Sequence, residues 1–349
     1  MLSREISEAV LTIGNECRPP KGGMAQVVFT YGKTLFKPFH FISFYNGGSS
    51  INKIYCFLTA LVKTICFLLF RRKIKIVHIH TGSATSFKRS SYFIKLSKWM
   101  HKKVVLHMHG GGFMEYYKGN SNYVDGIIKK VDVVVALTDR WKLFYEHIGC
   151  KKVCTVPNII EEPQIALVPQ KSTVHFLFLG LICDNKGIFD LLEVLAANKT
   201  TLKDKMILHI GGNGETSRLQ TFIKEHELEE LAVFEGWVSG DKKTALLNQC
   251  DCYILPSYIE GLPISILEAL SFGKFVVSTK VGGIPEIVND DNGLLFDSGN
   301  KTELWDALKY TLDHIETIRL SQPKIAATVE KHLPEAVSRN LESLYQELL

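Results

Sequence analysis

The 349 residues of the chain are enough for two domains of ordinary size, and the composition, with 46% hydrophobic and 22% charged residues, excludes a disordered chain and a coiled coil. The net charge of +5 conceals an asymmetry: residues 1–165 carry 24 Lys and Arg against 10 Asp and Glu (+14), whereas residues 166–349 carry 17 against 26 (−9). Opposite charges on the two halves predict two domains, and the basic half is suited to phosphates, nucleic acid or an anionic membrane surface.

Short β-branched runs alternate with segments of helical length through the first half of the chain. The predicted strands are residues 9–14, 74–80, 103–109, 132–137 and 152–158. Alternation of this kind predicts a parallel sheet with helices on both of its faces.

An apolar stretch at residues 54–70, interrupted by Lys63, has apolar side chains at helical spacing. It is shorter than the roughly 20 residues that span a bilayer. We expect a mostly buried amphipathic helix, and the alternative is a helix that also touches the membrane interface, next to the basic residues 71–75.

The strand–helix pattern stops near residues 160–172 and then starts again. The second series of predicted strands is residues 174–180, 206–212, 231–236, 252–257 and 274–279, and residues 302–349 are predicted to be helical. The interruption contains prolines and has no clear period, as a linker should. We therefore expect an N-terminal domain at 1–165, a C-terminal domain at 166–325, and a last helical segment at 326–349 that crosses back to the first domain.

The strongest local signal is the segment Ser257–Leu270, which follows a predicted buried strand and enters an apolar helix. Free N–H groups at a helix start suit a diphosphate, and ligands bind at the carboxyl ends of strands in open α/β sheets. Glu260 lies before this helix and Glu268 lies within it. A structural interpretation makes Glu260 a turn residue and Glu268 a surface residue. Because Glu268 is flanked by Leu267 and Ala269, we expect it to be largely buried with a partner.

This segment resembles the E-x7-E motif of the family 4 retaining glycosyltransferases, which have the GT-B fold of two Rossmann-like domains with parallel sheets facing an interdomain cleft. Further segments resemble the family in the same order along the chain, and together they cover roughly residues 9–320: 19–24, 107–113, 156–158, 178–187, 282–288 and 292–296. None of these short segments is specific alone, but their joint order is.

The resemblance implies a catalytic group of three residues and a donor-binding group. Glu260 would bind sugar hydroxyls, Lys186 the diphosphate, and His109 the transferred sugar, with His107 as the competitor of His109 on the same strand. Glu268 would bind the ribose. The other implied donor-binding residues are Gly22, Gly23, Gly180, Gly261, Leu262, Ile264 and Ser265. The sequence departs from the family at Leu181, where an Arg is usual, and this departure removes one cationic contact from the donor site.

No metal site and no cofactor is expected, because the sequence contains no Asp-x-Asp and the adjacent Asp290 and Asp291 precede Asn-Gly, a turn signal. The eight cysteines include no Cys-x-x-Cys pair, which favours free thiols in a reducing cytoplasm. The glycines at 211–214 lack the dinucleotide-binding spacing, so a nicotinamide enzyme is not predicted.

The predicted activity is transfer of a hexosyl or N-acetylhexosaminyl group, with retention, from a nucleotide-sugar, UDP-sugar being favoured. The expected acceptor is a glycan or a polyprenyl-diphosphate-linked glycan in bacterial surface polysaccharide biosynthesis. The expected location is the cytoplasm, with peripheral contact to the inner face of an anionic membrane and no contact with nucleic acid. A sugar-nucleotide 2-epimerase and a non-catalytic nucleotide-sugar-binding subunit remain as alternatives.

Overall fold

The structure is a computed structural model that describes residues 1–20, 22–166, 168–169 and 172–349. The chain forms two compact units, one of Met1–Glu161 with Lys331–Leu349 and the other of Glu162–Glu330. The expected boundaries at 165 and 325 lie four residues after and five residues before the observed ones. Lys21, in the glycine loop, and residues 167 and 170–171, in the expected linker, lie outside the described residues.

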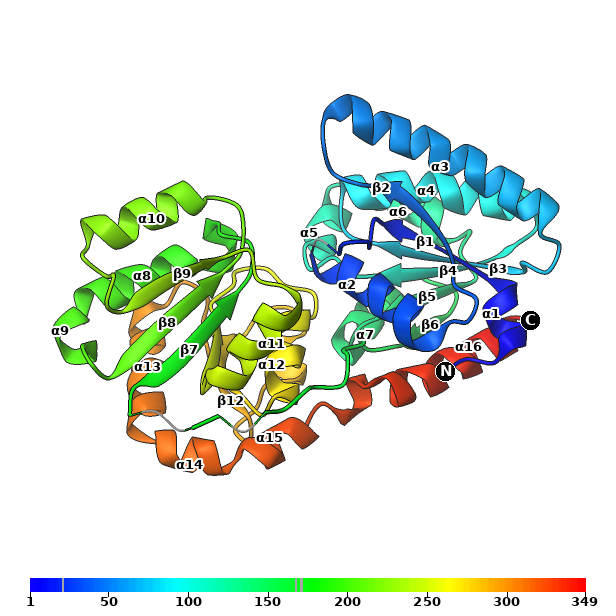
Figure 1. Ribbon diagram of the computed structural model, residues 1–349. Helices are drawn as coiled ribbons and strands as arrows, with labels where there is room; N and C mark the ends of the chain where they lie inside the picture. The colour runs from blue at the N-terminus through cyan, green and yellow to red at the C-terminus, as the bar shows by residue number, and fades with distance from the viewer. Residues whose placement is uncertain (21, 167, 170–171) are drawn as a thin grey trace. The chain divides into compact units, whose positions relative to one another are not determined.

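The first unit is built on a parallel sheet of six strands in the order β2-β1-β3-β4-β5-β6 (Figure 1). The strands are β1 (Val10–Asn15), β2 (His40–Tyr45), β3 (Ile76–Thr81), β4 (Lys103–Met108), β5 (Val133–Ala136) and β6 (Val153–Thr155). The helices are α1 (Arg4–Ala9), α2 (Gly23–Thr30), the π-helix η1 (Tyr31–Leu35), α3 (Ser50–Phe70), α4 (Thr85–Trp99), α5 (Phe113–Lys118), α6 (Ser121–Ile128), α7 (Asp139–His147) and α16 (Pro334–Leu348). The last helix is fixed in this unit, because the Tyr345 hydroxyl lies 2.6 Å from Nδ1 of His78 on β3.

The second unit repeats the plan, with a six-stranded parallel sheet in the order β12-β11-β10-β7-β8-β9. Its strands are β7 (Val174–Leu179), β8 (Met206–Gly211), β9 (Ala232–Gly236), β10 (Cys252–Leu255), β11 (Phe275–Thr279) and β12 (Gly293–Phe296). Its helices are η2 (Asp184–Lys186), α8 (Ile188–Ala197), α9 (Lys199–Leu202), α10 (Thr216–Glu225), α11 (Gly240–Gln249), α12 (Ile264–Ser271), η3 (Ile284–Glu286), α13 (Lys301–Asp313), α14 (Ile315–Leu320) and α15 (Gln322–Ala327), and the turn η4 (Glu330–His332) leads back to the first unit.

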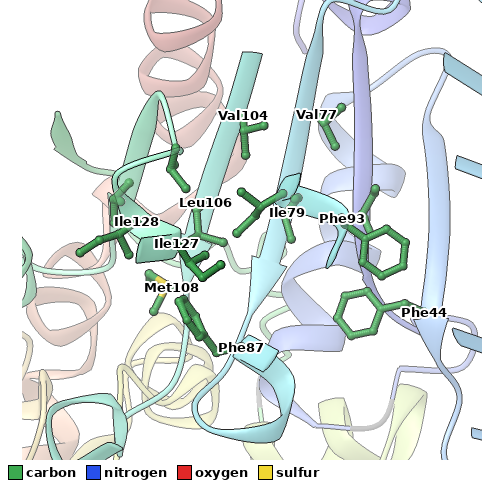
Figure 2. Close-up of a cluster of buried hydrophobic side chains, with 14 of the residues drawn as sticks. Phe44, Val77, Ile79, Phe87, Phe93, Val104, Leu106, Met108, Ile127 and Ile128 are labelled. Atoms are coloured by element: carbon green, nitrogen blue, oxygen red, sulfur yellow. The ribbon is translucent and has the colours of Figure 1, made fainter. Parts of the chain in front are cut away.

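The core of the first unit lies between its sheet and helices α3 to α7. Figure 2 shows part of this core: side chains of the central strands, such as Ile79 and Leu106, meet Phe87 and Phe93 of α4. Because such strands are buried on both faces, their sequences are nearly continuous apolar runs, which is the pattern that predicted them.

All ten predicted strand segments contain a strand, so the α/β prediction is confirmed. Two strands, β2 and β12, were not predicted. The prediction for residues 54–70 is wrong: α3 is a helix, but Ala60, Thr64 and Leu68 are its only fully buried residues. Its outward face is as apolar as its inward face, and the spacing of apolar residues alone cannot distinguish the two.

Candidate functional site

The strand order of the second unit creates a crevice position between β7 and β10. The chain runs from β7 outward through β8 to β9, and β10 then starts on the other side of β7. In open α/β sheets, ligands bind outside the carboxyl ends of the strands at such a switch point. The loops after β7 and β10 carry Gly180 and Lys186, and Glu260 and Gly261, respectively. The fold therefore brings these predicted residues to the place where a ligand is expected.

Glu260 is the central group of this position. Its side chain is 9% exposed, and its Oε1 accepts a hydrogen bond from Ser257 Oγ at 2.8 Å and a short ion pair from Lys186 Nζ. A carboxylate that is this deeply buried needs such hydrogen-bonding partners. Lys186 is itself only partly exposed. The site thus contains a cation and an anion in direct contact, either of which a ligand can share.

Two glycines hold the loops around Glu260 at close range. Gly187 has φ +66°, and a Cβ there would lie 2.0 Å from the Pro256 carbonyl oxygen. Gly282 has φ +57°, and its Cβ would lie 2.0 Å from the carbonyl oxygen of Glu260 itself. Only glycine fits a left-handed conformation with the backbone this near. The loop after β11 therefore presses on the Glu260 backbone, a contact that the motif at residues 282–288 did not reveal.

Glu268 is partly buried on α12 and is paired with a lysine that sequence reasoning missed. Lys243 Nζ, from α11, lies 2.6 Å from Glu268 Oε1, and both side chains are mostly buried. The expected partner of Glu268 therefore exists, and it comes from 25 residues earlier in the chain. No local motif points to Lys243, since its position depends on how α11 packs.

The start of α12 presents backbone donors that have no side-chain cap. Pro263 occupies the N-cap position and cannot supply one. The N–H groups of Ile264 and Ser265 lie in the first turn, where a helix offers no intrahelical acceptor. Leu262 and Ile264 are buried, and the Ser265 side chain hydrogen-bonds the hydroxyl of buried Tyr253. Burial raises the pKa of Tyr253, which keeps this phenol neutral. The helix start is thus rigidly supported and suited to an anion.

Gly180 ends β7 within a tightly packed turn. Its N–H donates to the Gly211 carbonyl at 3.0 Å, and a Cβ on Gly212 would lie 1.9 Å from the Gly180 carbonyl oxygen. Leu181, the next residue, is 49% exposed. Arg218 does not replace the missing arginine there, because its guanidinium is held by Asp184 at 2.9 Å and Glu215 at 2.8 Å.

In the first unit, His109 follows β4 and is the partly exposed end of a row of stacked histidines. Its Nε2 lies 2.9 Å from Nδ1 of His80, and its ring stacks on His107 at 4.4 Å. The protein atoms around the ring lower the pKa of His109 to about 3, against which a hydrogen bond to Asn158 acts weakly. His109 is therefore a neutral imidazole at physiological pH.

His107 is fully buried, as are His78 and His80. Burial also lowers the pKa of His107 well below its ordinary value. Of the two histidines that the sequence offered in this segment, only His109 retains exposed surface. His107 belongs to the interior of the unit.

The glycine loop of the first unit lies beyond β1, which is again a switch point of its sheet, between β1 and β3. Gly22 has φ +95° and forms the N-cap of α2, and Gly23 is the first residue of that helix. A Cβ on Gly22 would meet no atom within 4 Å. The backbone here is open to an incoming group, and the positive φ explains the glycine at this position.

Comparison with known proteins identifies the fold and a family that matches the second unit. Residues 160–319, which make up nearly the whole second unit, match the family model "Glycosyl transferases group 1". The second unit matches this family, and the chain has the GT-B fold. The solved structure of HepE from Anabaena in complex with UDP superposes with a TM-score of 0.78 at 14% identity, over 97% of this chain and 99% of HepE.

Relatives of the chain include the putative colanic acid biosynthesis glycosyltransferase WcaL of Escherichia coli, at 24% identity over 64% of this chain. N-acetyl-α-D-glucosaminyl L-malate synthase of Bacillus anthracis is 24% identical over 97% of both chains. The match spans 58% of the length of WcaL, and also 58% of an uncharacterised glycosyltransferase of Methanocaldococcus jannaschii that is 26% identical over 68% of this chain.

Proposed function

We propose that the chain is a retaining glycosyltransferase that moves a hexosyl or N-acetylhexosaminyl group from a nucleotide-sugar, UDP-sugar being favoured, to a glycan or polyprenyl-diphosphate-linked acceptor. The Lys186–Glu260 pair at the switch point of the second sheet, next to the uncapped start of α12, carries the proposal. The family match of the second unit and the UDP complex of HepE support the choice of donor. The name of WcaL supports a role in bacterial surface polysaccharide biosynthesis.

Each group has a role that its surroundings favour. Lys186 and the amides of Ile264 and Ser265 neutralise the charge that develops on the leaving diphosphate, an electrostatic stabilisation worth roughly 2.7–4 kcal/mol for one such donor in other enzymes. Glu260 accepts hydrogen bonds from sugar hydroxyls, and Ser257 fixes its orientation. Glu268, held by Lys243, accepts from the ribose hydroxyls.

His109 contacts the transferred sugar as a neutral imidazole, so it can donate or accept a hydrogen bond without adding charge. In the front-face displacement that the family resemblance implies, the leaving diphosphate takes the acceptor's proton, so no protein nucleophile is needed. We further propose that the protein works without a metal ion or other cofactor, in the cytoplasm, at the inner face of the cell membrane.

Two measurements test the proposal together. The purified protein is incubated with UDP-, GDP- and ADP-sugars, with and without a polyprenyl-diphosphate-linked acceptor, and the anomeric configuration of any product is read by NMR. We expect a product of retained configuration only when acceptor is present. A changed sugar-nucleotide without acceptor would indicate the 2-epimerase. Tight donor binding with no product from any acceptor would indicate the non-catalytic subunit, in which Leu181 replaces a needed cation.

Two neighbouring lysines on α11 provide a test variant and a matched control for donor binding. Lys243→Met leaves Glu268 without its partner, and we expect the donor to bind about tenfold more weakly, as for the loss of a charge-assisted hydrogen bond. Lys242→Met is the control, because Lys242 pairs with Glu235 at 3.0 Å. Calorimetric titration with the donor found in the screen measures both, and equal affinities would place the ribose elsewhere.

A further inference from the structure

Helix α3 of the first unit presents an apolar stripe that no described part of the chain covers. Ile51, Tyr55, Leu58, Val62 and Leu69 recur at steps of three and four residues, with the exposed Cys66 completing the row. Each of the five large side chains exposes more than half of its surface. An apolar patch this continuous is unusual on a soluble protein and marks an interaction surface.

The neighbouring helix α4 adds a second stripe of different chemistry. Its exposed positions Lys88, Tyr92, Lys95 and Trp99 also recur at steps of three and four, so that two lysines alternate with two aromatic rings. The helices are packed together, as Figure 1 shows, and the ring of Phe57 on α3 contacts that of Tyr92 at 5.5 Å. Tyr and Trp favour the interface between water and lipid, and lysines attract anionic headgroups.

The charge around the two stripes is of one sign. No Asp or Glu occurs between Glu16 and Glu115, whereas residues 50–103, which include both helices, contain 12 Lys and Arg. Arg71, Arg72 and Lys73 follow the end of α3 directly. In the first unit as a whole, 26 Lys and Arg face 12 Asp and Glu, a net charge of +14. The surface combines apolar side chains with a surrounding positive field.

We infer that the α3–α4 face docks onto an anionic lipid bilayer, with α3 lying in the plane of the interface. The inference deepens the proposed function, on which it rests, because a lipid-linked acceptor would lie in that bilayer. A second copy of the chain is the less favourable occupant, since a two-fold contact through this face would bring two basic surfaces together.

The packing of α3 favours an interfacial position over a spanning one. The helix is long and apolar enough to cross a membrane, and its 21 residues extend about 30 Å. However, Ala60 and Leu68 belong to the core cluster of the first unit, and Leu61 packs against that cluster. Leaving the unit would expose this core, whereas lying flat keeps it intact and buries the outer stripe in the headgroup region.

Flotation of the full chain with vesicles tests the inference. We expect it to float with phosphatidylcholine vesicles that contain phosphatidylglycerol, to float less at high salt, and to float poorly with pure phosphatidylcholine. Leu58→Gln with Val62→Gln removes the centre of the stripe and should weaken binding at least about tenfold. The control, Leu143→Gln with Leu320→Gln, replaces two exposed apolar side chains of α7 and α14 by Gln and should bind like the wild type.

Brominated lipids locate the contact, because they quench tryptophans that reach the acyl chains. We expect quenching in the wild type and its loss in Trp99→Phe. The inference is overturned if the wild type stays with the soluble fraction, if Leu58→Gln with Val62→Gln floats equally well, or if alkaline carbonate fails to release the protein, which would indicate a spanning helix. It is also overturned if the face proves to be a dimer contact, seen as self-association that the same two substitutions abolish.

Flotation, quenching and carbonate extraction use no nucleotide-sugar, so their results are independent of catalysis. We expect Leu58→Gln with Val62→Gln to retain donor binding and transfer to a soluble, detergent-dispersed acceptor, and to lose transfer to acceptor embedded in vesicles. Failure of the proposed function would instead abolish transfer to both acceptors while leaving flotation unchanged.

Discussion

The two units keep polar side chains in their interiors by opposite means. In the first unit, His78, His80 and His107 are fully buried as neutral imidazoles, stacked on one another with ring centroids 4.4 to 5.4 Å apart. In the second, partly buried charges are paired, Lys186 with Glu260 and Lys243 with Glu268. A neutral cluster avoids the cost of burying charge but is stable only while it stays unprotonated. A charged pair keeps both charges available to a ligand.

A fall in pH should produce a larger difference in stability between the two units than any substitution does. Burial lowers the pKa of His78 to about 3, and of His80 and His107 well below 6.5. Above the unfolded pKa of about 6.5 both states are neutral, and below it only the unfolded state binds protons. The stability of the first unit is therefore full above about pH 6.5 and falls as the pH drops. Each histidine lowers it by about 1.4 kcal/mol per pH unit until its own folded pKa is reached.

Urea unfolding followed by the fluorescence of buried Trp141 measures this effect, in a variant with Trp99, Trp237 and Trp305 replaced by Phe. We expect a loss of several kcal/mol between about pH 7.5 and about pH 5. His107→Leu removes one titrating ring, so its slope against pH should be shallower by about one proton, whatever its absolute stability. A stability of the first unit that does not change across this range would contradict the neutral cluster.

The charged pair of the second unit should matter for rate and little for folding. For Lys186→Met, we expect transfer to fall roughly 10²- to 10³-fold, because the leaving diphosphate loses its main cation. For Glu260→Gln we expect a similar fall, since the amide cannot replace an ionised acceptor of sugar hydroxyls. Steady-state transfer from the UDP-sugar measures both, and Lys199→Met, which removes an exposed lysine paired with Glu227, is the control.

Thermal unfolding checks that these variants are folded. If both retained near-wild-type rates, the donor site would have to lie elsewhere in the second unit. If Lys186→Met lost donor affinity and kept its rate, Lys186 would bind ground state and transition state equally.

The sequence predicted ten strands, among them the edge strands β6 and β9, and missed β2 and β12. Several residues of each missed strand are only partly buried, so neither forms the continuous buried run of a central strand. The family resemblance pointed to Lys186 and Glu260, and the structure places both in loops that follow the carboxyl ends of central strands. Lys243 and Gly282 were beyond its reach, since each acts through a contact with a residue more than 20 positions away.

The smallest expected effect concerns the one hydroxyl that ties the last helix to the histidine cluster. Tyr345 is fully buried, and its hydroxyl lies 2.6 Å from Nδ1 of His78. Tyr345→Phe leaves that nitrogen without a partner, and we expect a loss of about 1–3 kcal/mol in the free energy of unfolding. Tyr258→Phe, whose hydroxyl donates to Asp190 at the surface of the second unit, should cost less than about 1 kcal/mol. Urea unfolding of both variants at neutral pH compares them directly. If the two losses were equal, the buried hydrogen bond of Tyr345 would add nothing to the stability of the first unit beyond what an exposed one provides, and the cluster would be held by ring stacking and the His80–His109 contact.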